Sequence, residues 1–162
     1  GQMLTGAKGA GGEIGHIHMN DAEPDECGCG NHGCLEQYAS ATGVVRLAKR
    51  ALAKATEKTV LHADNVTAKD VWDAVKEGDP VALQVAEQFG KYLGEGLAIV
   101  ADVINPEAFV IGGGVSKAGE VLLSYIEKNY TKTVFHASRD VKFTLATLGN
   151  DAGIYGAAKL VI

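Results

Sequence analysis

The chain has 162 residues, of which 46% are hydrophobic and 22% are charged, close to the averages of globular proteins. This length suits one folded domain over residues 1–162 with a substantial buried core, and the composition argues against a disordered segment. The formal net charge of −5 argues against a general nucleic-acid binder, and no apolar run is long enough to span a membrane. No basic segment followed by an apolar run marks a signal peptide.

The N-terminal segment leads into a loop that contains all the cysteines. Residues 1–12 are rich in glycine, which predicts a loop or the remnant of a strand. The alternation of Ile14, His16 and His18 predicts a short strand after it. Three cysteines then follow among glycines: Cys27, Cys29 and Cys34. Cys27 and Cys29 are too close along the chain for an easy disulfide.

Three thiols and one imidazole form a complete tetrahedral ligand set for zinc. We expect His16 to be the fourth ligand, with His32 and His18 as alternatives. A closed site of this composition leaves no open position for water, so the metal is expected to be structural. The alternative is a set of three free cysteines in a reduced protein. Thiols without a disulfide framework indicate the cytoplasm.

Two carboxylates bracket the expected metal site. Glu13 precedes His16 by three residues, and Glu36 follows Cys34 by two. Carboxylates accept hydrogen bonds from hydroxyl groups, which suits a polyhydroxylated ligand such as a sugar. The alternative is that both side chains are solvated, as most glutamates are.

The middle of the chain predicts a layer of helices over residues 40–104. A helix starts after Gly33, and others cover 42–55, 68–76 and 80–104. Thr67 with Asp70 predicts a capping box, and Asp79 before Pro80 predicts another helix start. Trp72 is expected in the core or at an interface. Glycines interrupt the longest helix, which predicts close helix packing: Gly90, Gly94 and Gly96. One helix has a basic face that we interpret as solvated: Arg46, Lys49, Arg50 and Lys54.

The C-terminal part predicts strands that alternate with helices. Residues 108–111 form a short apolar run typical of a buried strand, and Asn105–Pro106 ends the helix before it. Gly112, Gly113 and Gly114 follow as a turn, with Ser116 as the N-cap of a helix to about residue 130. A strand, a glycine turn and a helix N-terminus together allow a nucleotide to approach the backbone closely.

Further along, alternation over residues 141–145 predicts a second strand. Asn150 and Asp151 then precede a terminal helix that they are expected to cap, and the small residues of this helix would allow close packing: Gly153, Gly156, Ala157 and Ala158. Strands interleaved with longer helices indicate an α/β domain.

Several motifs resemble the signature of the ROK family of bacterial sugar kinases and sugar-responsive repressors. They are Gly-Glu-Ile-Gly-His at 12–16, Cys-Gly-Cys-Gly-Asn-His-Gly-Cys-Leu-Glu-Gln-Tyr-Ala-Ser at 27–40, Ile-Asn-Pro-Glu at 104–107, Ile-Gly-Gly-Gly-Val-Ser-Lys-Ala-Gly at 111–119 and Leu-Gly-Asn-Asp-Ala-Gly at 148–153. Within the family, the likeness is greatest to the glucokinases of Gram-positive bacteria. The resemblance covers nearly the whole chain.

This resemblance implies the C-terminal lobe of an actin-like, ribonuclease-H-like sugar kinase fold with a structural zinc loop. It implies that zinc is bound by His16, Cys27, Cys29 and Cys34. Glu13, His16 and Glu36 would contact glucose or a related hexose. ATP with Mg²⁺ would lie against Gly112, Gly113 and Gly114.

The family's general-base Asp and its phosphate loop belong to an N-terminal lobe that this sequence does not contain. The resemblance therefore implies no catalytic residue within the chain, and we expect the chain alone to be inactive as a glucokinase. Two other functions stay open, namely the effector lobe of a ROK-type regulator and a zinc-stabilised module for protein association. N-acetylmannosamine and fructose are alternative hexoses, and a homodimer is the common default.

Overall fold

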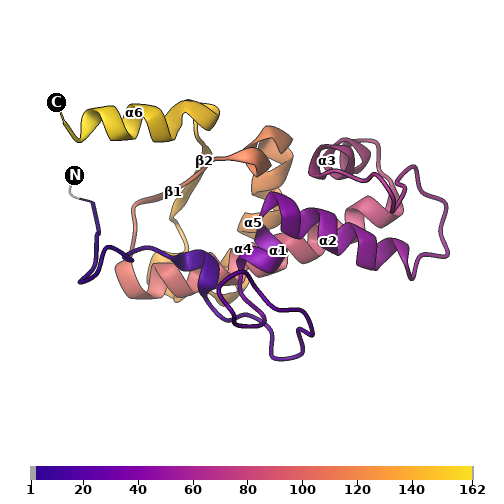
Figure 1. Ribbon diagram of the computed structural model, residues 1–162, viewed down its shortest axis with the longest axis horizontal. Coiled ribbons are helices and arrows are strands. Elements are labelled where there is room, and N and C mark those ends of the chain that lie inside the picture. The colour runs from indigo at the N-terminus through magenta and orange to yellow at the C-terminus, as the bar shows by residue number, and fades with distance from the viewer. Residues whose placement is uncertain (1–2, 162) are drawn as a thin grey trace.

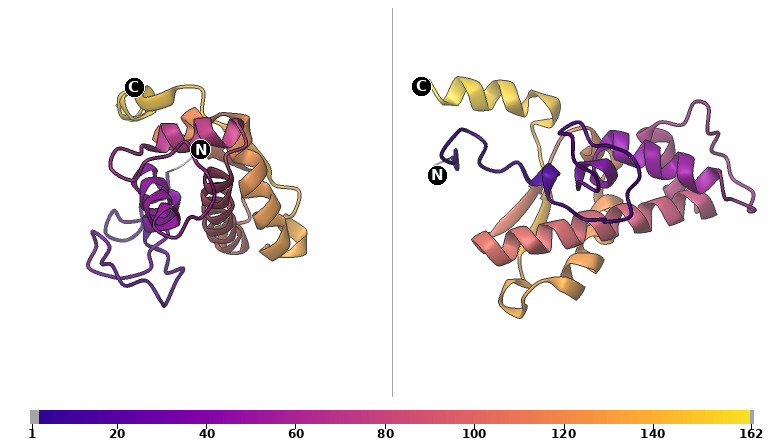
Figure 2. Two further views of the ribbon diagram at one scale, coloured as in Figure 1. Left: turned by 90° about the vertical axis from the view of Figure 1, so that its right-hand side faces the viewer. Right: turned by 60° about the horizontal axis from the view of Figure 1, so that its bottom comes forward.

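The computed structural model describes residues 3–161, and its centre is the long helix α4 (Pro80–Ile104). Seen nearly end-on in the left view of Figure 2, α4 lies between α2 and α5, and Figure 1 shows the same helices from the side. The helices packed on α4 are α1 (Glu36–Ala39), α2 (Ala41–Leu52), α3 (Ala68–Lys76) and α5 (Glu120–Thr133). No helix in the described part of the chain has the length and apolar character needed to cross a membrane.

The starts of these helices follow from short-range polar signals. The capping box of α3 is confirmed, because the Thr67 side chain accepts from the Asp70 N–H and the Asp70 carboxylate accepts from the Thr67 N–H. Asp79 caps α4 by accepting from the N–H groups of Val81 and Ala82. The helix predicted over 42–55 begins one residue earlier and ends at Leu52, because Ser40 supplies its cap.

Glycines permit the close approach of α4 to its neighbours, as predicted. A Cβ added at Gly90 would meet the backbone of Tyr125 on α5, and one at Gly94 would lie 2.7 Å from the Ile126 carbonyl oxygen. Gly96 faces the side chain of Leu35 in the same way. The loss of helix propensity at these positions is therefore offset by close packing. Trp72 is buried in this core, as predicted.

Two parallel strands form the sheet, β1 (Ala108–Ile111) and β2 (Lys142–Leu145), with α5 in the connection between them. Phe109 pairs with Phe143 in register, and both rings pack on Tyr130 of α5 at centroid distances of 5.9 and 5.0 Å. The predicted α/β character is confirmed, although helices make up most of the described structure. Val141 lies just before β2 and not inside it.

Two predicted elements are wrong. Residues Ile14–His16 form a 3₁₀ turn, η1, because the His16 N–H bonds back to the Glu13 carbonyl. Of Ile14, His16 and His18, His18 alone lies in an isolated antiparallel bridge, opposite Cys34. Ser116 is not an N-cap: it lies in a 3₁₀ turn, η2 (Gly114–Ala118), and α5 begins only after Gly119, whose φ of 83° and ψ of −163° interrupt the helical path.

The C-terminal helix α6 (Ala152–Lys159) follows a 3₁₀ turn, η4 (Gly149–Asp151), and lies apart from the helical body in Figure 1. The Asp151 side chain makes no capping bond, which corrects the predicted cap, and the side chain of Asn150 lies outside the described part. No described residue of α6 is buried, so the predicted close packing of its small residues is not made within residues 3–161. Gly1 and Gln2, part of the predicted N-terminal loop, lie outside the described residues.

Candidate metal and ligand site

The structure brings His16, Cys27, Cys29 and Cys34 together in one cluster. One ligand atom from each lies within 4.8 Å of all the others. The Cys29 and Cys34 Sγ atoms are 3.6 Å apart, and the Cys27 Sγ atom is 3.8 Å from His16 Nδ1. A tetrahedral zinc site with Zn–S bonds of about 2.3 Å has edges of about 3.8 Å. The observed spacings therefore fit a tetrahedral metal of this size.

All three cysteines are free, and the 3.6 Å between the Cys29 and Cys34 sulfur atoms is well above the length of a disulfide bond, about 2.05 Å. The Cys27 thiol donates to Glu36 Oε1 at 2.9 Å, and this bond raises the pKa of Cys27 to about 12. The Asn31 backbone N–H, in contrast, lowers the pKa of Cys29 to about 7. Burial raises the pKa of the Cys34 thiol. A metal ion binds thiolates, so it would have to displace the protons of the thiols on binding.

His16 is the histidine of the cluster. His18 faces elsewhere, because its Nδ1 lies 2.9 Å from the His32 carbonyl oxygen and its Nε2 lies 2.8 Å from Asp21 Oδ1. The hydrogen bond to Asp21 raises the pKa of His18. His32 is not among the grouped ligands. Of the three candidate histidines, only His16 therefore meets the sulfur atoms.

The imidazole of His16 lies between the cysteines and the two predicted carboxylates. Its Nε2 is 4.0 Å from Glu13 Oε2, and its Nδ1 is 3.9 Å from Glu36 Oε1. Glu13 is exposed, whereas Glu36 begins α1 and is partly covered. Gly15 adjoins Glu36, since a Cβ there would lie in ordinary contact with Glu36 Oε2, at 3.6 Å. The three predicted sugar-binding residues thus converge beside the cluster.

The loop reaches this shape through backbone bonds between its two arms. The Met19 N–H donates to the Gly33 carbonyl at 2.7 Å, and the Cys27 N–H donates to the Asn31 carbonyl at 2.6 Å. Gly33 has a φ of 73° and lies against the backbone of Asn20, where a side chain would collide. A glycine is therefore required at this crossing.

A buried carboxylate network, which the sequence did not indicate, connects the loop to the helices. Glu23 has a side chain with 0% exposure, and its oxygens accept from Arg50 at 2.7 and 2.8 Å and from Arg46 at 2.6 Å. The Tyr38 hydroxyl also donates to Glu23, at 2.5 Å. Asp25 accepts from both arginines. The interpretation of Arg46 and Arg50 as solvated is therefore wrong.

The hydrogen bonds of this network also shift the pKa values of its members. The hydrogen bonds from Arg50 hold the pKa of Glu23 well below its usual range, and Glu23 in turn raises the pKa of Arg50. Burial and the bond to Glu23 raise the pKa of Tyr38 to about 12. The Glu23 carboxylate and the Arg50 guanidinium are therefore both charged at neutral pH.

The predicted nucleotide-binding turn at Gly112, Gly113 and Gly114 lies near the start of α2. A Cβ at Gly114 would lie 3.7 Å from the Ala41 Cβ, and Ser40 donates to the Glu36 carbonyl oxygen. Gly113 has a φ of 73° and a ψ of −162°, a conformation essentially restricted to glycine. Nothing lies within 4 Å of a Cβ at this position, so its backbone faces open space.

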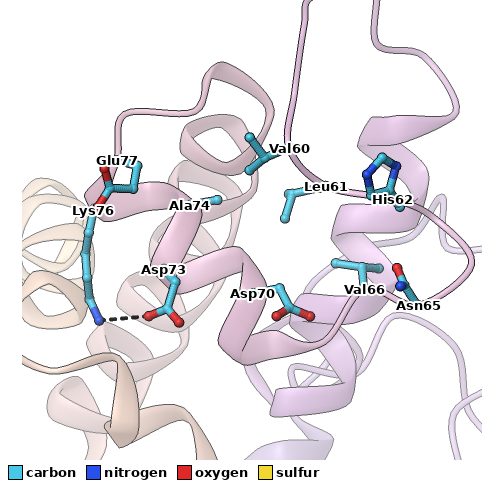
Figure 3. A pocket seen from close by; sticks show the side chains of 10 residues that line it. All are labelled: Val60, Leu61, His62, Asn65, Val66, Asp70, Asp73, Ala74, Lys76 and Glu77. Carbon is cyan, nitrogen blue, oxygen red and sulfur yellow. Dashed lines mark hydrogen bonds and ion pairs between the residues drawn. The ribbon is translucent and has the colours of Figure 1, made fainter.

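A hollow of about 490 Å³ lies away from these residues, between α3 and the segment before it. Figure 3 shows its polar side chains, among them Asp70 and Asp73 of α3 and His62. Asp70 is used in the capping box, and Asp73 pairs with Lys69 and Lys76. Both aspartates of this hollow therefore already have partners.

The chain is similar to known glucokinases and to a transcriptional regulator. A glucokinase of Halalkalibacterium halodurans is 43% identical over 166 residues, which cover 99% of this chain and 50% of that protein. The solved structure of a ROK family glucokinase from Streptomyces griseus, in complex with glucose and AMPPNP, matches with a TM-score of 0.81 at 36% identity, over 94% of this chain and 51% of that one. The transcriptional regulator NagC of Escherichia coli is 36% identical over 129 residues, 78% of this chain and 31% of the regulator.

The chain thus spans about half the length of the glucokinases that it matches. The ROK family matches residues 1–162, the full length of the sequence. The chain belongs to the ROK family.

Proposed function

We propose that the chain is the C-terminal, sugar-binding lobe of an ATP-dependent glucokinase with an actin-like, ribonuclease-H-like fold, forming one domain over residues 1–162. The observation that carries this proposal is the position of His16, with Nδ1 toward Cys27 and Nε2 toward Glu13. One imidazole can therefore serve a metal cluster and a neighbouring ligand. The likeness to a glucokinase solved with glucose supports a hexose as that ligand.

Zinc, held by His16 and the three cysteines, would supply structural cross-linking of the loop and no water activation, because the ligand set is closed. Glu13, Glu36 and the free nitrogen of His16 then provide acceptors and a donor for sugar hydroxyls. Glu36 starts α1, so its carboxylate is fixed at the junction of the loop and the helical layer. These residues bind and orient the sugar.

ATP with Mg²⁺ is proposed to lie against Gly112, Gly113 and Gly114. The backbone at Gly113 is open, and the turn adjoins the start of α2 a few residues after Glu36. This proximity supports transfer of the γ-phosphoryl group to the sugar 6-hydroxyl, a reaction that depends mainly on positioning and charge neutralisation.

A general base is proposed to come from further polypeptide, so the chain alone would not phosphorylate glucose. The exposed apolar residues of α6, including Ile154 and Tyr155, and the outer face of β1 at Val110 offer a surface on which such polypeptide would pack. We place the protein in the cytoplasm, where thiols stay reduced, as a homodimer.

A titration of the zinc-loaded chain with glucose, followed by two-dimensional NMR, tests the sugar site. Shifts should concentrate at residues near His16, and Glu36→Gln should weaken binding at least tenfold. Glu127→Gln, which changes an exposed glutamate on α5, is the matched control and should leave binding unchanged. Wild-type spectra that do not change up to high millimolar glucose would contradict the proposal. The same titration with N-acetylmannosamine and fructose ranks the alternative hexoses.

A second candidate function is the effector lobe of a sugar-responsive regulator, because NagC is 36% identical over most of this chain. Both functions require the sugar site, but only the kinase requires ATP at the glycine turn. Sugar binding without any nucleotide binding, together with a helix-turn-helix encoded directly upstream, would favour the regulator. Binding of neither ligand would favour a module for protein association.

A further inference from the structure

Glu23 lies outside the cluster of possible metal ligands, yet it is the most completely buried carboxylate attached to their loop. Its side chain is 0% exposed, although it belongs to a segment in which most neighbours are exposed. Four hydrogen bonds from Tyr38, Arg46 and Arg50 converge on its two oxygens. A buried charge with this many partners holds the backbone that carries it in one place.

The contacts of Glu23 connect the loop to two helices. Tyr38 comes from α1, whereas Arg46 and Arg50 stand one turn apart on α2. Both arginines also bind Asp25, which lies two residues before Cys27. The guanidinium groups therefore fix the loop immediately before its first cysteine.

A second set of hydrogen bonds connects the end of the loop at Cys34 to Asp25. Gln37 is buried, accepts from the Cys34 N–H at 3.0 Å and donates to the Asp25 carbonyl at 2.9 Å. The backbone of Cys34 is thus tied, through Gln37, to the residue that the arginines hold. None of these bonds involves a sulfur atom or a ring nitrogen of His16.

We propose that Glu23 is a positioning residue that keeps the cysteine loop in its metal-receiving shape before a metal ion arrives. This inference rests on the metal site of the proposed function. Because the bonds of Glu23 use no metal ligand, they hold the loop in the absence of metal. A loop that populates its receptive shape only part of the time loses apparent affinity in proportion to that fraction.

The expected effect of Glu23→Gln is a loss of about tenfold or more in Zn²⁺ affinity, the range seen when supporting partners of metal ligands are removed. The ligands themselves are unchanged, so Co²⁺ should still give the same thiolate absorption bands and the same one-to-one stoichiometry. In the metal-free protein, the Cys27 and Cys34 N–H groups should exchange with solvent faster, while the N–H groups of α4 keep their protection.

Two further variants separate positioning from a general loss of stability. Asp73→Asn removes an exposed carboxylate that also pairs with two cations, but on α3, and should leave Zn²⁺ affinity unchanged. Arg50→Lys keeps the charge and loses the forked pair of bonds to Glu23, so its affinity should fall between those of the wild type and Glu23→Gln. This milder variant also serves if Glu23→Gln does not fold.

The experiment is a Zn²⁺ competition titration of the four proteins against a chromogenic chelator, with hydrogen exchange of each metal-free form. Lower affinity in Glu23→Gln and Arg50→Lys, with faster exchange confined to the loop, is the expected result. Equal affinities and equal loop exchange in all four proteins would overturn the positioning role and leave the metal site standing. A similar loss in Asp73→Asn would also overturn it. A wild-type chain that binds no Zn²⁺ would overturn the metal site, and this inference with it.

Discussion

Replacing Gly90 by alanine is expected to destabilise the protein even though alanine is the better helix former. The new Cβ would lie 2.7 Å from the Tyr125 carbonyl carbon and closer still to its oxygen. Both atoms belong to the backbone of α5, which cannot yield as a flexible side chain does. The two helices must therefore move apart across the most extensive contact in the core.

The magnitude follows from two opposing effects. Alanine gains about 1 kcal/mol of helix propensity over glycine, whereas overpacking a close-packed site costs about 1–3 kcal/mol. Because the obstacle is backbone, we take the upper end of that cost and expect a net loss of about 2 kcal/mol in the free energy of unfolding. For a chain of this size the loss lowers Tm by about 4–8 °C.

Two other glycines provide a graded comparison. At Gly96 the obstacle is the end of the Leu35 side chain, 2.8 Å away, which can rotate, so Gly96→Ala should cost less than Gly90→Ala. At Gly156 on α6 nothing lies within 4 Å, so alanine should be neutral or stabilise by up to about 1 kcal/mol. Urea unfolding at constant metal loading measures all three variants. A Gly90→Ala protein as stable as the wild type would refute the packing argument.

Three other perturbations test the loop and the turn. Glu23→Gln should lower the free energy of unfolding at pH 7 by roughly 3 kcal/mol, the low end for a broken buried ion pair because Arg46 and Arg50 are partly exposed. Since the folded-state pKa of Glu23 is depressed, its contribution is present above the usual value of 4.5 and is lost as the pH falls below it, so acid titration of both proteins should show their stabilities converge. Cys29→Ser should lower Tm and remove both zinc and glucose binding, whereas an unchanged Tm with lost binding would deny the metal a structural role. Gly113→Ala should cost about 1–3 kcal/mol through backbone strain and weaken ATP binding in calorimetry, while Gly112→Ala, at a glycine without a positive φ, serves as the milder comparison.

Local signals in the sequence predicted the helical layer well. The starts of α3 and α4 are set by the adjoining N-caps Thr67 and Asp79, so a few neighbouring residues were enough to predict them. The gathering of His16 with the three cysteines could be predicted as well, because cysteines that lie in one stretch leave few ways to arrange their sulfur atoms. The sequence favoured His16 over His18, and the structure supplies the reason, because Asp21 and the His32 carbonyl hold the His18 ring.

The failures concern interactions that depend on the path of an irregular loop. Glu23 meets Arg46 and Arg50 across a long stretch of chain. The i, i+4 spacing of the two arginines does not distinguish a pair that binds a buried carboxylate from a pair on a solvated helix face. The strand predicted at Ile14 had alternation but no partner strand, so a tight turn formed in its place. At Ser116 a favourable capping residue was overridden by Gly119, whose conformation ends the 3₁₀ turn before α5 begins.

The cluster of His16 and three cysteines is the centre of this account, and its metal content is the measurement that tests it most directly. Elemental analysis of protein purified without chelator should give about one zinc per chain, and a thiol assay should find three reactive thiols only after the metal is removed. Protein without metal, with three thiols that react freely from the start, would contradict the proposed site. Glu13 and Glu36 would then lack the metal-stabilised loop that is proposed to position them for sugar binding.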